Sequence, residues 1–230
     1  GSTWNSYRFS LHNKVPNFFM EPYHHTYYNQ QFEAFGFKPL ADYFSAIVQS
    51  EEIDFTRLLE LEKRFQEQGA QIQSIDPNNF SRELEEMAQL SLAGFAANFL
   101  YSPIAVTDFV RKYAAIKRYM DPDLILTARN KLGELEAFIF CIPDLVDPKR
   151  ESIIIKSMVR KPGTPFKGIG SYLSLKVMQL AKEKGFKRVI HAMMISSNAS
   201  LQISKKTKAK VFKEYRLYTM NLWISRNSFL

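Results

Sequence analysis

Two glycines separated by one residue stand where a strand-like segment leads into a helix. Residues 152–159 are rich in isoleucine, residues 165–168 contain proline and glycine, and a helix is expected from about Ser171. Gly168 and Gly170 have no Cβ, which would otherwise block the close approach of an anion to the backbone. Unpaired N–H groups and the positive end of the helix dipole would face that anion. The spacing suits a pyrophosphate, and it also occurs in simple turns.

The distribution of charge supports an anionic ligand near this loop. The chain has 31 Lys+Arg and 23 Asp+Glu, a net charge of +8. The segment Lys149–Arg216 holds 17 of the basic residues and 3 of the acidic ones, so it carries +14 and the remainder carries −6. A phosphate group, a nucleic acid or an anionic lipid would each suit such a segment.

The composition also excludes several classes of protein. With 230 residues, of which 46% are hydrophobic, the chain can form one large domain or two small ones. The single cysteine, Cys141, excludes an internal disulfide and indicates a reducing compartment, so we expect a cytoplasmic protein. The uncharged stretch Met87–Thr107 contains several polar residues and Pro103, which favours a buried helix and its loop over a membrane span.

Hydrophobic periodicity and turn residues predict a series of helices and strands. The helices are expected at 27–35, 55–68, 80–99, 107–119, 171–184 and 199–206. The strands are expected at 42–49, 70–75, 124–129, 134–142, 152–159, 189–194 and 212–223. This order predicts an α/β fold of the mixed α+β kind, in which helices cover a mixed sheet.

The strand, glycine loop and helix together resemble the cofactor motif of the GNAT acyltransferase superfamily, Arg/Gln-x-x-Gly-x-Gly/Ala. Gly168 and Gly170 match the two glycines, and Ile169 fills the position between them. Pro165 stands where the motif has Arg or Gln, and Lys167 is the candidate to replace the lost charge. The resemblance implies a GNAT-like fold with a mostly antiparallel central sheet flanked by helices. It also implies acetyl-CoA or another acyl-CoA as co-substrate, with its pyrophosphate at this loop and at Ser171.

Three further segments are similar to parts of that superfamily. Asn198-Ala199-Ser200 resembles the Asn-x-Ser that follows the fifth strand, which assigns Asn198 and Ser200 to the pantetheine arm. Glu214–Tyr218 resembles a Glu-Tyr-x-Leu-Tyr signature of bacterial members with a long N-terminal extension. Residues 27–49 resemble the last helix and strand of a GNAT fold. We therefore expect an acyltransferase-like domain at 51–230. Residues 1–50 are then the end of a preceding GNAT-like half or an unrelated extension.

In such enzymes an amine attacks the thioester carbonyl directly. The resemblance places the donor to the oxyanion at a backbone N–H of strand 152–159, near Met158 or Val159, and assigns Ser157, Met158 and Val159 to the cofactor site. Tyr215 and Tyr218 are chemically suited to return a proton to the leaving thiolate, and packing of an edge strand explains them equally. Because they are three residues apart in an alternating strand, at most one of them can face the site.

The resemblance thus implies the transfer of an acyl group from acyl-CoA to an amine. We expect the acyl group to be acetyl. A catalytically inactive module of the same fold that binds CoA or nucleic acid is the alternative. The lysines between Lys205 and Lys213 form a local basic run, but no known nucleic-acid motif accompanies them. We expect acyl-CoA and an amine as partners, without nucleic acid or membrane, and a homodimer is compatible with the sequence.

Overall fold

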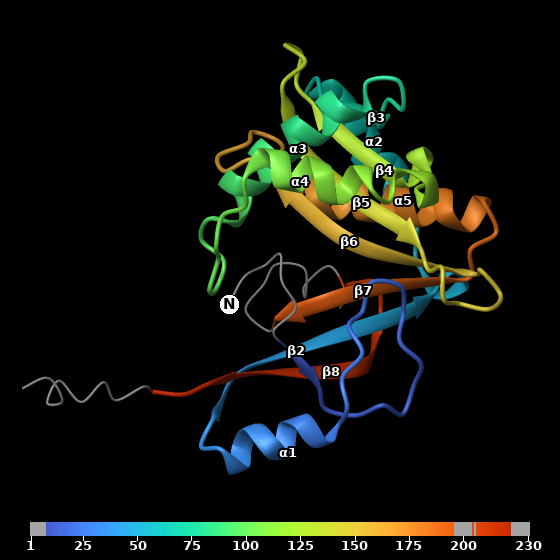
Figure 1. The fold of residues 1–230 in the computed structure, drawn as a ribbon. Helices are drawn as coiled ribbons and strands as arrows, with labels where there is room; N and C mark the ends of the chain where they lie inside the picture. Colours follow the sequence, from blue (N-terminus) through green and yellow to red (C-terminus); the bar gives the residue numbers. More distant parts are fainter. Residues whose placement is uncertain (1–7, 196–203, 205, 222–230) are drawn as a thin grey trace, which may run out of the picture.

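The computed structural model of the chain describes residues 8–195, 204 and 206–221 (Figure 1). One eight-stranded sheet forms its centre, with the strand order β1-β8-β2-β7-β6-β5-β4-β3. The strands are β1 (Phe9–Ser10), β2 (Lys38–Gln49), β3 (Gln71–Ser74), β4 (Ile125–Arg129), β5 (Leu135–Pro143), β6 (Ser152–Arg160), β7 (Arg188–Ile195) and β8 (Lys210–Thr219). The α-helices are α1 (Tyr27–Ala34), α2 (Leu58–Glu67), α3 (Phe80–Phe95), α4 (Val106–Ala114) and α5 (Ile169–Glu183).

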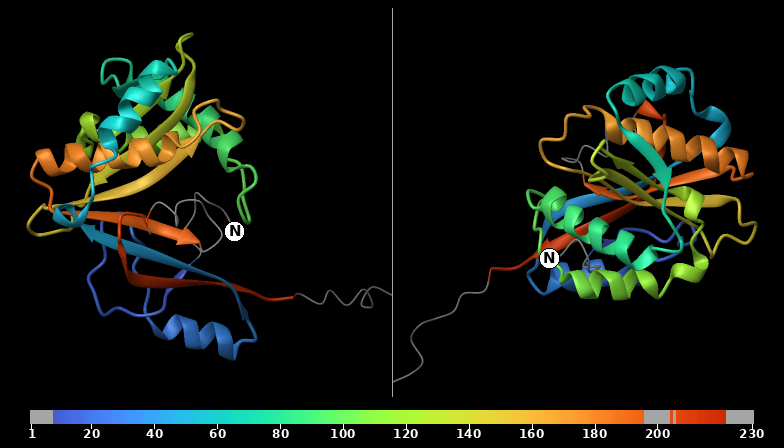
Figure 2. Two further views of the ribbon diagram at one scale, coloured as in Figure 1. Left: turned by 180° about the vertical axis from the view of Figure 1, so that it is seen from behind. Right: turned by 90° about the horizontal axis from the view of Figure 1, so that it is seen from above.

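Helices cover both faces of the sheet. Figure 2 shows α3 and α4 on one face and α2 and α5 on the other. Phe138 and Ile139 are neighbours in β5, and both are buried, but they belong to the two different hydrophobic cores. Because successive side chains of a strand point to opposite faces, β5 is buried from both sides and anchors the two cores.

The sheet is mixed and mostly antiparallel, as predicted. All neighbouring strands pair antiparallel except β6 and β7, which are parallel and joined through α5. Strand β2 lies between β7 and β8 and pairs with both, so residues before position 50 belong to the same sheet as the rest. The origin of residues 1–50 in a preceding GNAT-like half stays a prediction.

Most predicted elements are confirmed, with shifted ends. Helix α5 begins at Ile169 and not at Ser171, because Gly168 takes a left-handed conformation (φ +86°) as its N-cap and starts the helix earlier. Helix α3 ends at Phe95, four residues before the predicted end. The short helix predicted at 199–206 lies largely outside the described residues. Within the described ranges, every helix is too short or too polar to cross a bilayer.

Candidate active site

Strands β6 and β7 separate halfway along their length. Their parallel pairing runs from Ser152 opposite Arg188 to Ile155 opposite His191, and no later pair joins them in the described part of the chain. Strand β6 nevertheless continues along β5 as far as Arg160. Figure 1 shows the two strands diverging toward their carboxyl ends. The edge of β6 beyond Ile155 therefore offers backbone groups to a ligand instead of to a strand.

A β-bulge marks the place where the strands separate. Phe140 of β5 pairs with Ser157 and the next residue, Cys141, pairs with Ile155, so Lys156 is an extra residue in β6. A bulge bends its strand and redirects side chains. It explains why β6 turns away from β7 directly after its last pair with that strand. It also places the interruption at the segment where the sequence analysis expects the oxyanion donor.

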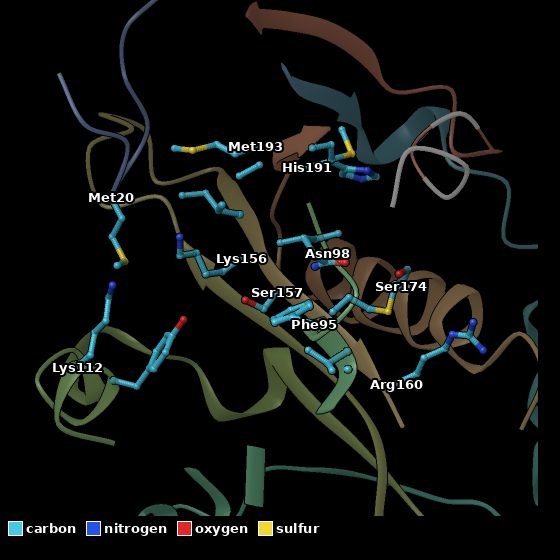
Figure 3. A pocket seen from close by; sticks show the side chains of 18 of the residues that line it. Met20, Phe95, Asn98, Lys112, Lys156, Ser157, Arg160, Ser174, His191 and Met193 are labelled. Carbon is cyan, nitrogen blue, oxygen red and sulfur yellow. The ribbon is translucent and has the colours of Figure 1, made fainter. Parts of the chain in front are cut away.

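A cavity of about 490 Å³ fills the space between the diverging strands (Figure 3). Residues 154–160 of β6 and 191–194 of β7 form two of its walls. The end of α3, helix α4 and the N-terminal segment close it with Phe95, Asn98, Lys112, Tyr113, Arg8 and the run Phe18–Met20. Ser157, Met158 and Val159 all line this cavity, so the structure brings these three predicted site residues together.

Two consecutive residues at the bulge face helix α4. Ser157 shares a hydrogen bond with the hydroxyl of Tyr113, and burial raises the pKa of that tyrosine to about 12. The ammonium of Lys156 is near Lys112 of α4 and Arg8 of the N-terminal segment. Burial, followed by repulsion from these two cations, lowers the pKa of Lys156 to about 8.

His191 lies at the last pair between β6 and β7 and lines the cavity. Its side chain is buried, and its Nε2 has no hydrogen-bond partner in the described ranges. Burial lowers its pKa to about 4, so the imidazole is neutral near pH 7. A buried polar atom without a partner is costly, so this nitrogen is suited to a hydrogen bond with a bound ligand.

The glycine loop reaches the same region from the other face of the sheet. The N–H of Ile169 donates to Phe166 O at 3.1 Å, and the N–H of Tyr172 donates to Gly168 O at 3.2 Å. The two N–H groups between them, those of Gly170 and Ser171, have no backbone partner among the described residues. They form the open N-terminal turn of a 15-residue helix, which is an arrangement that binds phosphate oxygens.

Gly170 also holds the loop close to β6. A Cβ on this residue would lie 2.8 Å from the sulfur of Met158, so glycine lets α5 approach the strand that lines the cavity. Beside Gly168, the Arg64 guanidinium of α2 donates to Lys167 O at 3.0 Å. The exposed Lys167 side chain and Arg64 thus place two cations near a loop in which Pro165 replaces the motif's Arg or Gln.

Several solved structures have a similar fold. A GCN5-related N-acetyltransferase from Sphaerobacter thermophilus superposes with a TM-score of 0.61 at 14% identity, over 84% of this chain and 56% of that one. The chain has the GNAT fold. The tandem GNAT protein of the clavulanic acid biosynthesis pathway gives a TM-score of 0.57 at 11% identity, over 86% of this chain and 59% of that one. L-PGS from Bacillus licheniformis superposes with a TM-score of 0.55 at 21% identity, over 82% of this chain and 64% of that one.

The GNAT likeness is confined to structure. No protein-family model matches the sequence, and no curated protein matches it. The chain spans less than two thirds of each of the three solved structures named above. The fold class and the resemblance expected from the glycine motif are confirmed.

The GNAT fold of this chain does not bring either predicted tyrosine to the cavity. The Tyr215 hydroxyl donates to Glu21 Oε1 at 2.8 Å, and the Tyr218 hydroxyl donates to Glu33 Oε1 at 2.9 Å. Neither residue is among those that line the cavity. The reason is the inserted strand β2, which separates β8 from β7. Burial, and then the Glu21 carboxylate, raises the pKa of Tyr215, which further opposes proton exchange.

Other predicted residues have different outcomes. Asn198 and Ser200 lie outside the described residues, directly after β7. Gly168, Ile169, Gly170 and Ser171 form the start of α5 as the motif requires, although Ile169 itself is buried in the core. Four residues of the cavity could not be predicted, because nothing in their spacing along the chain shows that they meet: Lys156, Lys112, Arg8 and Tyr113.

Eight of the 17 basic residues in the segment Lys149–Arg216 form ion pairs with acidic side chains. Arg188 pairs with Asp147 at 2.8 Å, and Lys176 pairs with Glu62 at 3.2 Å. Comparable pairs occupy six more of its basic residues: Lys161, Lys184, Lys187, Lys210, Lys213 and Arg216. Lys156 and Arg160, which line the cavity, have no ion-pair partner in the part of the chain that is described.

Proposed function

We propose that this chain transfers an acyl group from acetyl-CoA, or another acyl-CoA, to an amine that attacks the thioester directly. The observation that carries the proposal is the separation of β6 from β7 at a bulge, next to a helix start with two N–H groups free to bind an anion. The GNAT fold supports it, since such folds in solved N-acetyltransferases have the same overall arrangement.

Different groups of the chain would bind different parts of the acyl-CoA. The N–H groups of Gly170 and Ser171 would take the pyrophosphate, with the Arg64 and Lys167 cations beside them. The free edge of β6, from Ser157 to Val159, would take the pantetheine arm and the thioester. Asn198 and Ser200 remain proposed contacts of the pantetheine arm, on the resemblance alone.

In the proposed reaction the amine nitrogen forms a bond to the carbonyl carbon and the carbon–sulfur bond breaks. The amine loses one proton and the CoA thiolate gains one. The contribution of the chain is to hold the two reactants in line and to supply backbone N–H groups of β6 to the developing oxyanion. These N–H groups are fixed by the pairing of β6 with β5, so they need no rearrangement during the reaction.

A protein that binds acyl-CoA without turnover is the second candidate. The engagement of the Tyr215 and Tyr218 hydroxyls by Glu21 and Glu33 favours it, because neither tyrosine can serve as the proton donor at the cavity. Release of free CoA in the presence of an amine separates the two candidates, since a binding module releases none.

Isothermal titration calorimetry with acetyl-CoA tests the proposal. We expect the wild-type chain to bind acetyl-CoA and the Gly170→Val variant to bind it about tenfold or more weakly, because the new side chain displaces the Met158 thioether that lines the cavity and crowds the N–H groups at the start of α5. Gly185→Ala is the control: this glycine follows the other end of α5, and an added Cβ there meets no atom within 4 Å, although its φ of +90° strains an alanine. It therefore reports the effect of strain in α5 away from the proposed site. Absence of binding to the wild type, or equal binding by both variants, would refute the proposed site.

A further inference from the structure

The ionisable side chains that line the cavity are unbalanced in charge. Four of them are cations, namely Arg8, Lys112, Lys156 and Arg160. In the described part of the chain, no aspartate or glutamate lines the cavity with them. His191 is neutral and Tyr113 remains protonated near pH 7, so neither offsets this charge.

Three of the four cations gather at the end of the cavity under α4. Lys112 and Arg8 both act on the ammonium of Lys156, which the bulge directs toward α4. In Figure 3 the side chains of Lys112 and Lys156 point into the same end, whereas Arg160 and Ser174 lie at the other end. Arg8 is held in place by the Tyr43 ring, 4.1 Å from its guanidinium carbon, and by Met193. We call Arg8, Lys112 and Lys156 the cationic cluster.

The rest of the chain cannot neutralise this cluster with an acidic side chain that the structure leaves undescribed. Residues 1–7, 196–203, 205 and 222–230 contain neither aspartate nor glutamate. Lys156 itself has no ion-pair partner in the described ranges, whereas the buried Lys213 ammonium is 2.6 Å from Glu21 Oε2. Three cations gathered in a partly buried cavity repel one another, so they favour a negatively charged ligand.

The expected acyl-CoA does not use the cationic cluster for its pyrophosphate. That group is assigned to the N-terminus of α5, which packs on the face of the sheet opposite to α4. The cluster therefore lies on the side that remains for the acceptor. A simple amine is itself a cation near pH 7 and would meet three like charges there.

We propose that the cationic cluster binds an anionic group, a carboxylate or a phosphate, that the acceptor amine carries. This inference rests on the proposed acyl transfer and narrows its acceptor to small amines with a negative group, as opposed to polyamines or lysine side chains. The anion offsets the cluster and orients the amine toward the free edge of β6. Removal of one cation weakens this binding and leaves the α5 loop intact.

Binding is measured first by calorimetry, without acetyl-CoA, so that the result does not depend on turnover. The probes are phosphoethanolamine against ethanolamine, and the proteinogenic L-amino acids against their carboxamides. We expect measurable binding of at least one anionic member and about tenfold weaker binding of its neutral partner. A difference within the phosphoethanolamine and ethanolamine pair identifies phosphate as the recognised group, and a difference between an amino acid and its carboxamide identifies carboxylate.

Variants then locate the site. Lys112→Gln and Arg8→Gln should each weaken binding of the anionic probe about tenfold, with the affinity for acetyl-CoA unchanged. Arg111→Gln is the matched control, because Arg111 is adjacent on α4 and likewise exposed, but it is not among the residues that line the cavity and is paired with Asp108 at 2.7 Å. Release of CoA with the same probes should follow the same order.

The outcomes separate this inference from the proposed function. If acetyl-CoA does not bind but the anionic probe binds through Lys112, the acyl-transfer proposal fails and the anion site stands. If acetyl-CoA binds but anionic and neutral probes bind or react equally, or Lys112→Gln changes nothing, the anion site is overturned. If no probe binds at about 10 mM, well beyond the range of ordinary substrate affinities, the anion site is also overturned.

Discussion

A buried ion pair joins the N-terminal segment to β8 and allows a sharp test of what holds the cavity wall in place. Lys213 Nζ is 2.6 Å from Glu21 Oε2, and both side chains have an exposed fraction of 0%. Lys213 also donates to Asn17 Oδ1 at 2.8 Å. The Glu21 carboxylate receives two more hydrogen bonds, from the Phe18 N–H at 3.1 Å and the Tyr215 hydroxyl at 2.8 Å.

We predict that Lys213→Met lowers the free energy of unfolding by about 3 kcal/mol. Removal of one partner of a buried pair typically costs about 3–5 kcal/mol, because the other charge stays buried without compensation. The lower end applies here, since two donors to Glu21 remain. Replacement of both charges should recover most of the loss, so Glu21→Leu with Lys213→Met should be at least about 1 kcal/mol more stable than Lys213→Met alone.

Urea unfolding at pH 7, followed by circular dichroism, measures these differences. Lys210→Met is the control on the same strand, because Lys210 is 79% exposed and only 3.7 Å from Glu52 Oε1. Its substitution should cost less than about 1 kcal/mol. This prediction is refuted if Lys213→Met is no more destabilising than Lys210→Met. It is also refuted if the double variant, Glu21→Leu with Lys213→Met, is less stable than Lys213→Met alone.

Two further predictions concern pH. Burial raises the pKa of Asp147, but hydrogen bonds from Ser152 and Arg188 outweigh it and lower the value from 3.8 to about 2. Because the pKa of Asp147 is lower in the folded chain than in the unfolded one, Asp147→Asn should lower the free energy of unfolding by about 2 kcal/mol at pH 7. The loss should become progressively smaller as the pH falls from 4 toward 2. An equal loss in urea unfolding at pH 3 and pH 7 would contradict this prediction. For Lys156, burial and the nearby Lys112 and Arg8 lower the pKa from 10.5 to about 8, so its charge opposes folding below pH 8 and the penalty disappears as the pH rises toward 10.5. Lys156→Met should therefore stabilise the chain by up to about 3 kcal/mol at pH 7 and by less at pH 10. Between these pH values the nearby Tyr113 and His191 do not titrate in the folded chain, whereas Lys112, whose pKa burial lowers, begins to lose its charge and reduces the penalty further. No gain at pH 7 would count against the cationic cluster.

The sequence predicts local structure in this chain well, because local signals determine it. Apolar runs and the turn at Gly133 identify β4, β5 and β6, and glycines mark the ends of α2 and α5. The strand, the Gly168–Gly170 spacing and the helical segment after it together indicate a helix start with open N–H groups, and the structure places that start two residues before the predicted one. These features depend on a few adjacent residues, and the structure confirms them with only small shifts.

The sequence does not predict features that depend on strand order or on register. Tyr215 is suited to proton transfer by type, but its place depends on β2 inserting between β7 and β8. Lys156 reads as one charged residue in an apolar strand, and only the register with Phe140 and Cys141 shows that it is a bulge. The cationic cluster joins Arg8, Lys112 and Lys156 from three separate parts of the chain, so no spacing could reveal it.

The proposed function requires acyl-CoA to bind between β6 and β7 with its pyrophosphate at the start of α5. A crystal structure of the chain with CoA would show whether it does. We predict pyrophosphate oxygens within hydrogen-bond distance of the Gly170 and Ser171 N–H groups, and the thiol end beside the β6 edge from Ser157 to Val159. CoA bound at any other surface, with this cavity empty, would contradict it.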